Sequence, residues 1–262
     1  MTQNDNLRPE GSQAIYPSLR GKAVIVSGGG SGIGAGLVEG FARQGARVGF
    51  VDIAEEASAQ VVDSLGAAEH QPVFRQCDVT DTATYTGTLD TLMDEIGGCD
   101  ILINNAASDD RHAVEDVSDA YWDERMAVNL KHQFFAARHA AARMEKQGGG
   151  VILNLGSISW HLGLEDLVIY QTAKAAIEGM TRALARELGP KNIRVNTIIP
   201  GNVKTPRQMK WYSPEGEQEI VDAQCLKGRL EPVDIAAMAL FLSSDDARLC
   251  TAHNYWVDAG WR

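Results

Sequence analysis

The sequence has few of the features that mark metal-binding or disulfide-bonded proteins. Its four cysteines lie far apart in the chain and have no paired spacing. They are Cys77, Cys99, Cys225 and Cys250. We expect buried or free thiols in a reducing compartment, rather than zinc ligands or disulfide bonds. The six histidines form no H-E-x-x-H motif or similar ligand set, so no metal site is expected.

Charge and hydropathy argue against two further kinds of partner. The formal net charge is −11 and basic residues do not cluster, which excludes nucleic acid and anionic membrane as expected partners. No apolar run approaches the roughly 20 residues that span a bilayer. The N-terminus is polar and lacks the apolar core of a secretory signal. We expect a cytoplasmic protein with a flexible N-terminal arm over residues 1–20.

Short apolar runs alternate with segments of helical periodicity along the rest of the chain. Strands are expected at residues 22–27, 46–52, 72–79, 100–107, 150–157, 193–201 and 254–258. Helices are expected at residues 37–45, 54–65, 81–96, 118–147, the second half of 156–189, and 232–243. This alternation predicts a single α/β domain over residues 21–262: a doubly wound, Rossmann-type parallel sheet of about seven strands with helices on both faces. Residues 202–229 form a mostly polar insert.

The run GGGSGIG at residues 28–34 lies between the first expected strand and a helix. Glycines there permit a tight turn and let backbone N–H groups approach a pyrophosphate at the positive end of the helix. The alternative is a glycine-rich turn without a ligand. Asp52 ends the second strand, where a carboxylate can bind both hydroxyls of an adenosine ribose. A 2′-phosphate would meet that negative charge, and residues 29–31 offer no cation, so NAD is favoured over NADP.

Tyr170 and Lys174 are four residues apart in an expected helix, and Ser157 precedes them in a loop. Residues at i and i+4 share a helix face, so the phenol and the ammonium lie side by side. We expect the charge of Lys174 to lower the pKa of the tyrosine by about two units at about 6 Å, so that Tyr170 can act as a general base. Ser157 can hold the reacting oxygen beside the phenol. The alternative is a solvated helix face.

Taken together, these motifs resemble the short-chain dehydrogenase/reductase family over about residues 20–262. SGGGSGIG at 27–34 is similar to its cofactor loop, with Ser27 where Thr is usual. NNAA at 104–107 is similar to its NNAG motif. The resemblance implies a catalytic set of Asn129, Ser157, Tyr170 and Lys174. It implies cofactor contacts from Gly28, Ser31, Gly32, Ile33, Gly34, Asp52, Asp78, Val79, Asn105, Ala106, Tyr170, Lys174, Gly201, Val203 and Thr205. In the family, the lysine also binds the nicotinamide ribose, and the asparagine holds a water that relays the proton.

A finer resemblance is to bacterial NAD-dependent aldopentose 1-dehydrogenases, carried by runs such as NNAASDDRH, PGNVKT and WVDAGWR. It implies oxidation of D-xylose or L-arabinose at C1 to a lactone, which hydrolyses to the aldonic acid. Another sugar, polyol or hydroxy-ketone oxidoreductase of the family is an alternative. A non-catalytic NAD sensor is a third, although such sensors typically lack the Tyr–Lys pair. The resemblance also implies a homotetramer, and the small residues in 129–147 and 170–189 suit close helix packing.

The substrate should meet the loops that follow residues 107, 157 and 201. These loops supply polar and aromatic side chains, which suit a small neutral sugar better than a steroid or an acyl chain. The candidates are Ser108, Asp109, Ser157, Trp160, His161, Glu165, Asn202, Gln208 and Trp211. Each has an alternative: Asp109 and Glu165 as solvated loop charges, His161 as a structural histidine, and Trp211 as lid packing.

Overall fold

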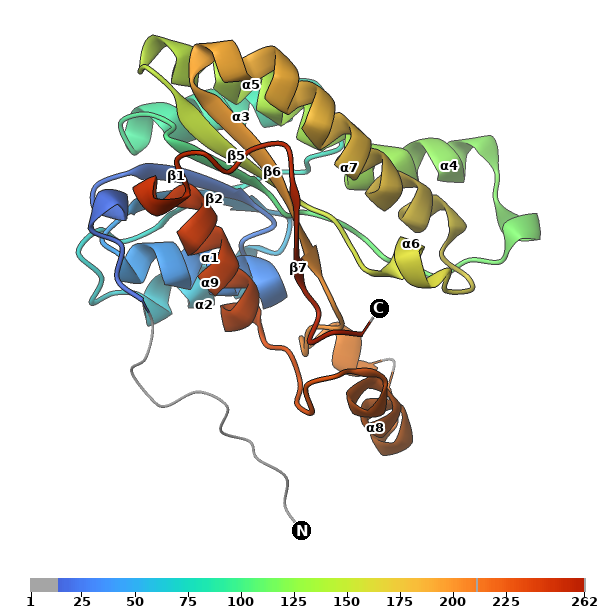
Figure 1. The fold of residues 1–262 in the computed structure, drawn as a ribbon. Coiled ribbons are helices and arrows are strands. Elements are labelled where there is room, and N and C mark those ends of the chain that lie inside the picture. The colour runs from blue at the N-terminus through green and yellow to red at the C-terminus, as the bar shows by residue number, and fades with distance from the viewer. Residues whose placement is uncertain (1–13, 211, 262) are drawn as a thin grey trace.

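The computed structural model describes residues 14–210 and 212–261, which form a seven-stranded parallel sheet between two layers of helices (Figure 1). The strand order is β3-β2-β1-β4-β5-β6-β7. The strands are β1 (Ala23–Ser27), β2 (Arg47–Asp52), β3 (Val73–Gln76), β4 (Ile101–Asn104), β5 (Gly150–Leu155), β6 (Ile193–Pro200) and β7 (Asn254–Val257). Each neighbouring pair is parallel, which confirms the predicted doubly wound α/β fold.

The central strands are buried on both faces, because helices cover both sides of the sheet. Successive side chains of a strand point to opposite faces. Accordingly, Val24 and Val26 of β1 pack into one hydrophobic cluster, and Ala23 and Ile25 pack into the other. Several strands end earlier than predicted, because their last residues leave the ladder of parallel hydrogen bonds. Residues 77–79 and 105–107 therefore lie in loops rather than in β3 and β4.

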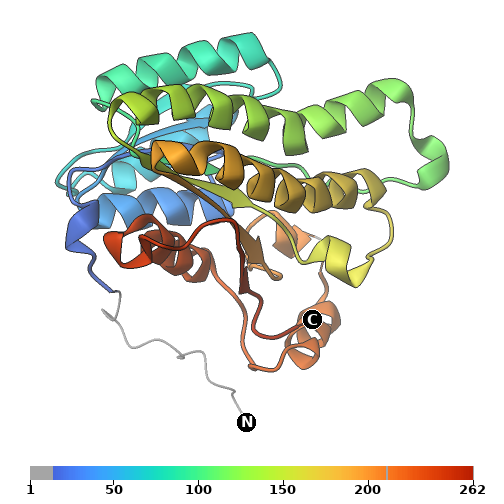
Figure 2. The same ribbon diagram turned by 45° about the horizontal axis from the view of Figure 1, so that its top comes forward.

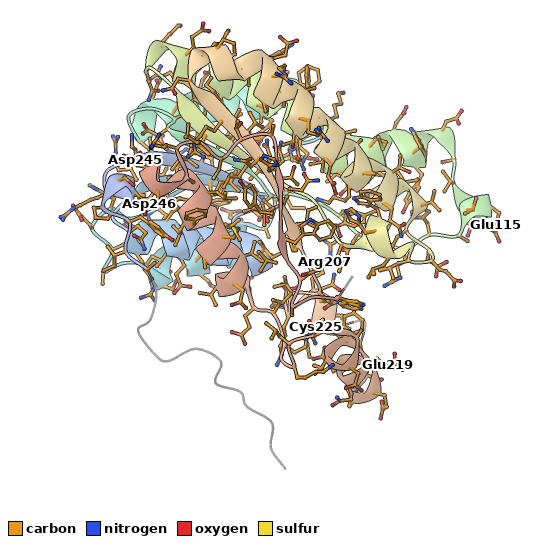
Figure 3. The ribbon with its side chains drawn as sticks, viewed as in Figure 1. Glu115, Arg207, Glu219, Cys225, Asp245 and Asp246 are labelled. Atoms are coloured by element: carbon orange, nitrogen blue, oxygen red, sulfur yellow. The ribbon has the colours of Figure 1, made fainter. Side chains whose placement is uncertain are left out.

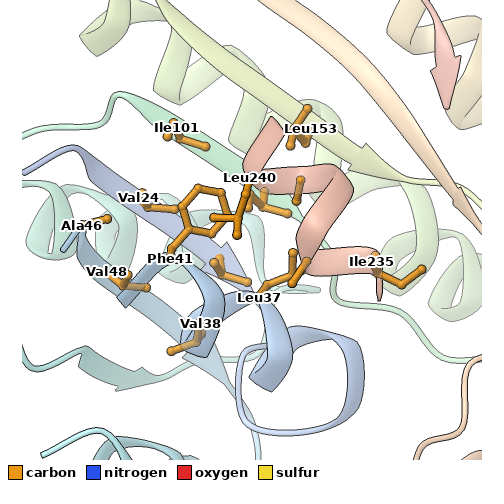
Figure 4. Close-up of a cluster of buried hydrophobic side chains, with 14 of the residues drawn as sticks. Val24, Leu37, Val38, Phe41, Ala46, Val48, Ile101, Leu153, Ile235 and Leu240 are labelled. Carbon is orange, nitrogen blue, oxygen red and sulfur yellow. The ribbon is translucent and has the colours of Figure 1, made fainter. Parts of the chain in front are cut away.

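The helices divide into two layers, as Figure 2 shows from a second direction. One layer holds α1 (Gly32–Arg43), α2 (Glu55–Ser64) and α9 (Pro232–Ser243), and the other holds α3 (Thr82–Glu95), α5 (His132–Lys146) and α7 (Val168–Leu188). Figure 4 shows the first interface, where Leu37 and Phe41 of α1 meet Ile235 and Leu240 of α9 over Val24. At about 25 cal/mol per Å² of apolar surface, such burial is the main favourable term for the fold.

The predicted helical region 118–147 is divided in three parts. α4 (Asp119–Met126) leads into a π-helical turn, η3 (Ala127–Lys131), which leads into α5. The residues at both junctions keep helical dihedral angles, so the chain passes through without a break. π-turns inside helices are rare and are frequent at functional sites. This one contains Asn129, whose side chain is buried.

Two segments around the sheet need separate description. Residues 1–13, most of the predicted arm, lie outside the described residues. The end of that arm is packed, because Leu19 in the short helix η1 (Pro17–Leu19) is fully buried. The predicted insert 202–229 contains a short 3-10 helix, η5 (Gln208–Lys210), and α8 (Pro214–Ala223), which lies apart from both layers (Figure 1). In the described part of the chain, no helix has the length and hydropathy that crossing a membrane requires.

Candidate active site

The carboxyl ends of the parallel strands bring the predicted site residues to one edge of the sheet. β1 lies between β2 and β4, so the chain leaves toward opposite sides of the sheet after β1 and after β4. In open α/β sheets such a switch point is where ligands bind. The glycine loop follows β1, residues 105–112 follow β4, Ser157 follows β5 and the insert follows β6.

The glycine loop is tightly held and has no room for larger residues. Gly28 has a φ of +69°, in the left-handed region that favours glycine. A Cβ placed on Gly34 would lie 1.7 Å from the carbonyl oxygen of Gly28, and one on Gly30 would lie 2.5 Å from Oγ of Ser58. The loop leads into α1, where Ser31 at the N-cap makes no side-chain capping bond. The first N–H groups of any α-helix have no intrahelical acceptor, and here the Ser31 side chain does not supply one, so these groups can bind an anion.

Asp52 is fixed at the end of β2 by the neighbouring backbone. Its Oδ2 accepts a hydrogen bond from the Gly30 N–H at 2.9 Å, and its Oδ1 accepts one from Ala54 at 2.9 Å. A carboxylate has about four lone-pair sites, so two remain for the hydroxyls of a ribose. Together with the uncapped helix end, this geometry fits the adenosine half of a dinucleotide.

Hydrogen bonds of Ser27 and Asn105 hold the end of β1 to the residues that follow β4. Oγ of Ser27 accepts hydrogen bonds from the N–H groups of Asn105 at 3.0 Å and Ala106 at 3.1 Å. In return, Nδ2 of Asn105 donates to the carbonyl oxygens of Ser27 and Gly28. The hydroxyl needed at position 27 is thus supplied by Ser in place of the usual Thr. Two further predicted cofactor residues follow β3. Oδ1 of Asp78 accepts hydrogen bonds from the N–H and the hydroxyl of Thr80, and Val79 is buried.

Tyr170 and Lys174 lie side by side on the first turns of α7, as predicted. Nζ of Lys174 is 5.4 Å from the centroid of the Tyr170 ring and donates a 2.8 Å hydrogen bond to the carbonyl oxygen of Leu155. This bond attaches the helix to the end of β5, two residues before Ser157. Oγ of Ser157 is 2.9 Å from Oγ of Ser159, and the Ser157 hydroxyl is near enough to Tyr170 to lower the pKa of the phenol.

Burial controls the ionisation of this pair when the chain is alone. It raises the pKa of Tyr170, the carboxylate of Asp109 raises it further, and Ser157 and Arg207 lower it. Burial also lowers the pKa of Lys174 to about 8, against the opposing effect of Asp109. The net shift of the tyrosine is therefore upward, opposite to the lowering that the sequence predicted from Lys174 alone. The prediction omitted desolvation, which both side chains undergo because Lys174 is buried and Tyr170 is partly buried.

Asn129 joins the π-turn to the loop after β4. Its Nδ2 donates to the carbonyl oxygens of Ser108 and Arg125, and its Oδ1 accepts from the Ser108 N–H at 2.9 Å. Both amide hydrogens are therefore used within the chain. The side chain acts on the site by fixing the backbone of Ser108.

The predicted substrate residues after β5 are bonded to a carboxylate that sequence reasoning missed. Oε1 of Glu178, on α7, accepts hydrogen bonds from Nε1 of Trp160 at 2.7 Å and Nε2 of His161 at 2.9 Å. Its Oε2 accepts from Nδ2 of Asn254 on β7. His161 thus makes the contacts of its alternative, structural role. A signal was present in the sequence, because Glu178 lies four residues after Lys174 on the same helix face.

The other candidates lie in the loop after β4 and in the insert. Nδ2 of Asn202 donates to the Tyr212 hydroxyl, which donates to Oε1 of Gln208, whose Nε2 donates to Oδ2 of Asp109 at 2.6 Å. Asn202 also accepts from Arg229. Ser108 accepts from two arginines, Arg125 and Arg207, which the sequence analysis did not select. Their signal is weak, because arginine is common in polar loops.

Five further predicted residues belong to the loops after β5 and β6. Glu165 is exposed, and its backbone carbonyl oxygen accepts a 3.4 Å hydrogen bond from Arg111. Both earlier interpretations of its side chain, a substrate contact and a solvated loop charge, therefore stay open. Gly201 packs its backbone against Asp258, Val203 bridges to Leu230, and Thr205 lies against Gly32 of the glycine loop. Trp211 lies outside the described residues. Among the residues that the structure describes, no group of three or more His, Cys, Asp or Glu could hold a metal ion.

A glycine loop at a helix N-terminus beside a Ser, Tyr and Lys set is the arrangement of a dinucleotide-dependent oxidoreductase. Residues 28–262 match the family model described as enoyl-(acyl carrier protein) reductase. The chain belongs to the short-chain dehydrogenase/reductase family, which confirms the resemblance of its motifs.

Individual relatives are similar over nearly the whole chain. The chain is 60% identical to D-xylose 1-dehydrogenase of Caulobacter vibrioides over 251 residues, 96% of this chain and 100% of the relative. It is 45% identical to a probable galactose dehydrogenase of Rhizobium meliloti, over 94% and 96% of the two chains. Among solved structures, 7α-hydroxysteroid dehydrogenase in complex with NADH and 7-oxo glycochenodeoxycholic acid has a TM-score of 0.89 and 33% identity, covering 93% and 96%.

Proposed function

We propose that this chain oxidises an aldopentose, D-xylose or L-arabinose, at C1 to the aldonolactone, with NAD⁺ as the hydride acceptor. The observation that carries the proposal is the 60% identity to D-xylose 1-dehydrogenase over 96% of this chain. The site supports it, because Ser157, Tyr170 and Lys174 lie together at the carboxyl edge of the sheet. NAD⁺, when bound, would supply the hydride acceptor and a positive charge for this site.

The roles of the chain's own residues follow from their contacts. Tyr170 takes the proton of the C1 hydroxyl. The positive charge of the bound cofactor would offset the upward shift that burial gives the pKa of Tyr170. Ser157, whose hydroxyl lowers the pKa of the phenol, holds the reacting oxygen. Lys174 supplies a positive charge 5.4 Å from the centroid of the Tyr170 ring and a hydrogen-bond donor for the nicotinamide ribose. Asn129 keeps the Ser108 backbone in place and lies on the route by which the proton leaves through water.

The choice of NAD over NADP rests on Asp52. Its two free lone-pair sites suit the 2′- and 3′-hydroxyls of the adenosine ribose, whereas a 2′-phosphate would meet like charge. The loops after β4 and β6 bring mainly polar side chains to this edge of the sheet, among them Asp109, Asn202 and Gln208. Such a lining suits a neutral polyhydroxy substrate.

The test is a measurement of NADH formation by the purified protein with a panel of alcohols. D-xylose, L-arabinose, D-galactose, D-glucose and simple polyols are each supplied with NAD⁺ and with NADP⁺. We expect the highest kcat/KM with a pentose and NAD⁺. The galactose arm matters because of the 45% identity to a probable galactose dehydrogenase, and preference for galactose would replace the pentose with a hexose. Absence of NADH with every pentose would refute the proposal.

Tyr170→Phe is the internal control for the mechanism. The variant removes one hydroxyl from a partly buried ring and should fold and bind NAD⁺, but its turnover should fall by about 10²-fold or more, as expected for a lost general base. Near-normal turnover would show that another group takes the proton.

We also propose a homotetramer. Phe134 on α5 is 40% exposed, and a Cβ added to Gly179 on α7 would meet nothing within 4 Å, so these two faces can receive a neighbouring subunit. Light scattering coupled to size exclusion tests the assembly, and Gly179→Trp should shift it toward smaller species. A monomeric wild type would end this proposal without affecting the proposed chemistry.

A further inference from the structure

Arg207, in the insert after β6, reaches across the site to the loop after β4. Its Nε is 2.9 Å from Oδ1 of Asp109. Its two other nitrogens donate to the carbonyl oxygen of Ala107 at 3.1 Å, to Oγ of Ser108 at 3.1 Å and to Oδ1 of Asp110 at 3.3 Å. One guanidinium thus binds four consecutive residues that lie about a hundred positions earlier in the chain. Figure 3 labels Arg207 between α8 and the sheet.

Both oxygens of the Asp109 carboxylate are bonded by the insert. Arg207 binds Oδ1, and the side-chain amide of Gln208 donates to Oδ2 at 2.6 Å. The side chain of Asp109 is 22% exposed and that of Arg207 is 46% exposed, so the pair lies at the wall of an accessible site rather than in the core. Two bonds leave lone pairs on the carboxylate free to accept from other hydroxyls.

Asp109 lies within electrostatic reach of the reacting groups. Its negative charge raises the pKa of both Tyr170 and Lys174, and the positive charge of Arg207 acts on Tyr170 in the opposite direction. The next carboxylate along the loop, Asp110, is bound by Arg125 at 2.6 Å, and Arg125 also binds Glu124. Three carboxylates therefore share two guanidiniums, those of Arg125 and Arg207. Without Arg207, one negative charge would remain unpaired beside the phenol that must lose its proton.

We propose that Arg207 is a positioning residue for sugar oxidation: it holds Asp109 in one orientation to accept hydroxyls of a neutral sugar, and neutralises its charge toward Tyr170. This inference rests on the proposed function. The substrate class that such a wall accepts is a neutral polyol or aldose. A sugar acid would place its carboxylate against Asp109 and Asp110 and compete for the guanidiniums that they already bind.

Other charged or titratable groups also face Tyr170 and its surroundings. Lys174 lies on the same helix, and Asp109 and Arg207 come from the two loops. His132, the first residue of α5, is near enough to Lys174 that the charge of the lysine lowers the pKa of the imidazole. His112 accepts a 3.4 Å bond from the Ile169 N–H and packs edge-on against Tyr121 of α4. Among these groups, in the residues that the structure describes, Arg207 is the only cation that contacts Asp109. Substituting Arg207 and Asp109 can therefore isolate the effect of the Asp109 charge on Tyr170.

The experiment compares Arg207→Gln, Arg207→Lys, Asp109→Asn and the double variant Asp109→Asn with Arg207→Gln. For each, kcat and KM are measured against pH with NAD⁺ and the best pentose. The active tyrosine is the deprotonated one, so an unpaired Asp109 should move the acid limb of kcat/KM to higher pH. We expect an upward shift of about one unit in Arg207→Gln, and a limb at or below the wild-type position in both Asp109→Asn variants.

Arg207→Lys keeps the charge but loses the forked geometry, so its pH profile should stay close to wild type while KM rises several-fold. An unchanged pH profile in Arg207→Gln would overturn the inference, as would a shift that persists in the double variant. The thermal midpoints of the wild type, Arg207→Gln, Asp109→Asn and the double variant, measured without sugar, form a double-mutant cycle, which measures the pairing independently of turnover. Additive midpoint changes would also refute the pairing. If the wild type oxidises no pentose, the proposed function fails, whereas the cycle still reports on Asp109 and Arg207.

Discussion

Nε2 of His161 lies 2.9 Å from Oε1 of Glu178, so the loop that follows Ser157 is attached to α7 one helical turn beyond Lys174. The carboxylate is only 9% exposed and also accepts from Trp160 and Asn254. Burying a carboxylate is costly unless several donors satisfy it, and here three do. Glu178 therefore joins the Ser157 loop, the catalytic helix and β7 in one polar cluster.

Removing this carboxylate should destabilise the protein far more than removing a surface one. In Glu178→Leu, three donors lose their acceptor, and we expect the free energy of unfolding to fall by about 3 kcal/mol or more. Glu178→Gln should lose about 1–3 kcal/mol, since one amide oxygen remains. Urea unfolding at fixed protein concentration measures both. Glu187→Gln, at an exposed position of the same helix, is the matched control, and equal losses in the two Gln variants would contradict the role of Glu178.

Gly34→Ala should abolish cofactor binding while Gly40→Ala should not. A Cβ on Gly34 would lie 1.7 Å from the Gly28 carbonyl oxygen, whereas one on Gly40 would lie 3.3 Å from the Cβ of Ala236. Both residues are in α1, so helix propensity changes equally. NAD⁺ should raise the thermal midpoint of the wild type and of Gly40→Ala, because a ligand of the folded state stabilises it. A normal rise in Gly34→Ala would show that the loop is not the cofactor site.

Asp52→Asn should reverse part of the cofactor preference. The substitution keeps the size of the side chain but removes the charge that receives the ribose hydroxyls, so kcat/KM with NAD⁺ should fall about 10- to 100-fold, the equivalent of one charged hydrogen bond. The value with NADP⁺ should fall less or rise. Steady-state kinetics with both cofactors measure the ratio. Asp63→Asn, at an exposed position of α2, should leave the ratio unchanged, and an unchanged ratio in Asp52→Asn would remove the argument from charge.

His132 should make the folded protein sensitive to acid. Burial lowers its pKa to about 3, although its bond to the Ala106 carbonyl oxygen favours the charged form and the charge of Lys174 opposes it. The unfolded chain, with a pKa near 6.5, binds the proton more readily. The contribution of His132 to stability is therefore present above pH 6.5 and is lost progressively as the pH falls toward 3.

The measurement is the unfolding free energy at pH 7 and at pH 5, for the wild type and for His132→Gln. Between these pH values the wild type should lose up to about 2 kcal/mol more than the variant, since 1.5 pK units separate 6.5 from 5. His70→Gln, which makes the same chemical change on an exposed side chain, serves as the control. Equal losses in the wild type and His132→Gln would show that another group governs the acid limb.

The fold and the reacting pair could be predicted because their signals are local. The alternation of short apolar runs with helical periodicity determines a parallel sheet with two helical layers, and the structure confirms it. Tyr170 and Lys174 share a helix face by spacing alone. The glycine loop could be recognised in the same way, since its glycines are consecutive in the sequence between a strand and a helix. The π-turn at Asn129 escaped prediction, because a shift of one hydrogen bond leaves no mark in hydrophobic periodicity.

The sequence by itself thus determined the doubly wound sheet, the glycine loop and the position of Tyr170 beside Lys174. Only the tertiary structure decided which partners the polar loop residues have. Glu178 pairs with His161, 17 positions away in the chain, and Arg207 pairs with Asp109, 98 positions away. Spacing cannot encode such pairings, since they depend on where strand ends bring separate loops together. Burial decided the ionisation of Tyr170 for the same reason, because desolvation is a property of the packed surroundings rather than of the residue.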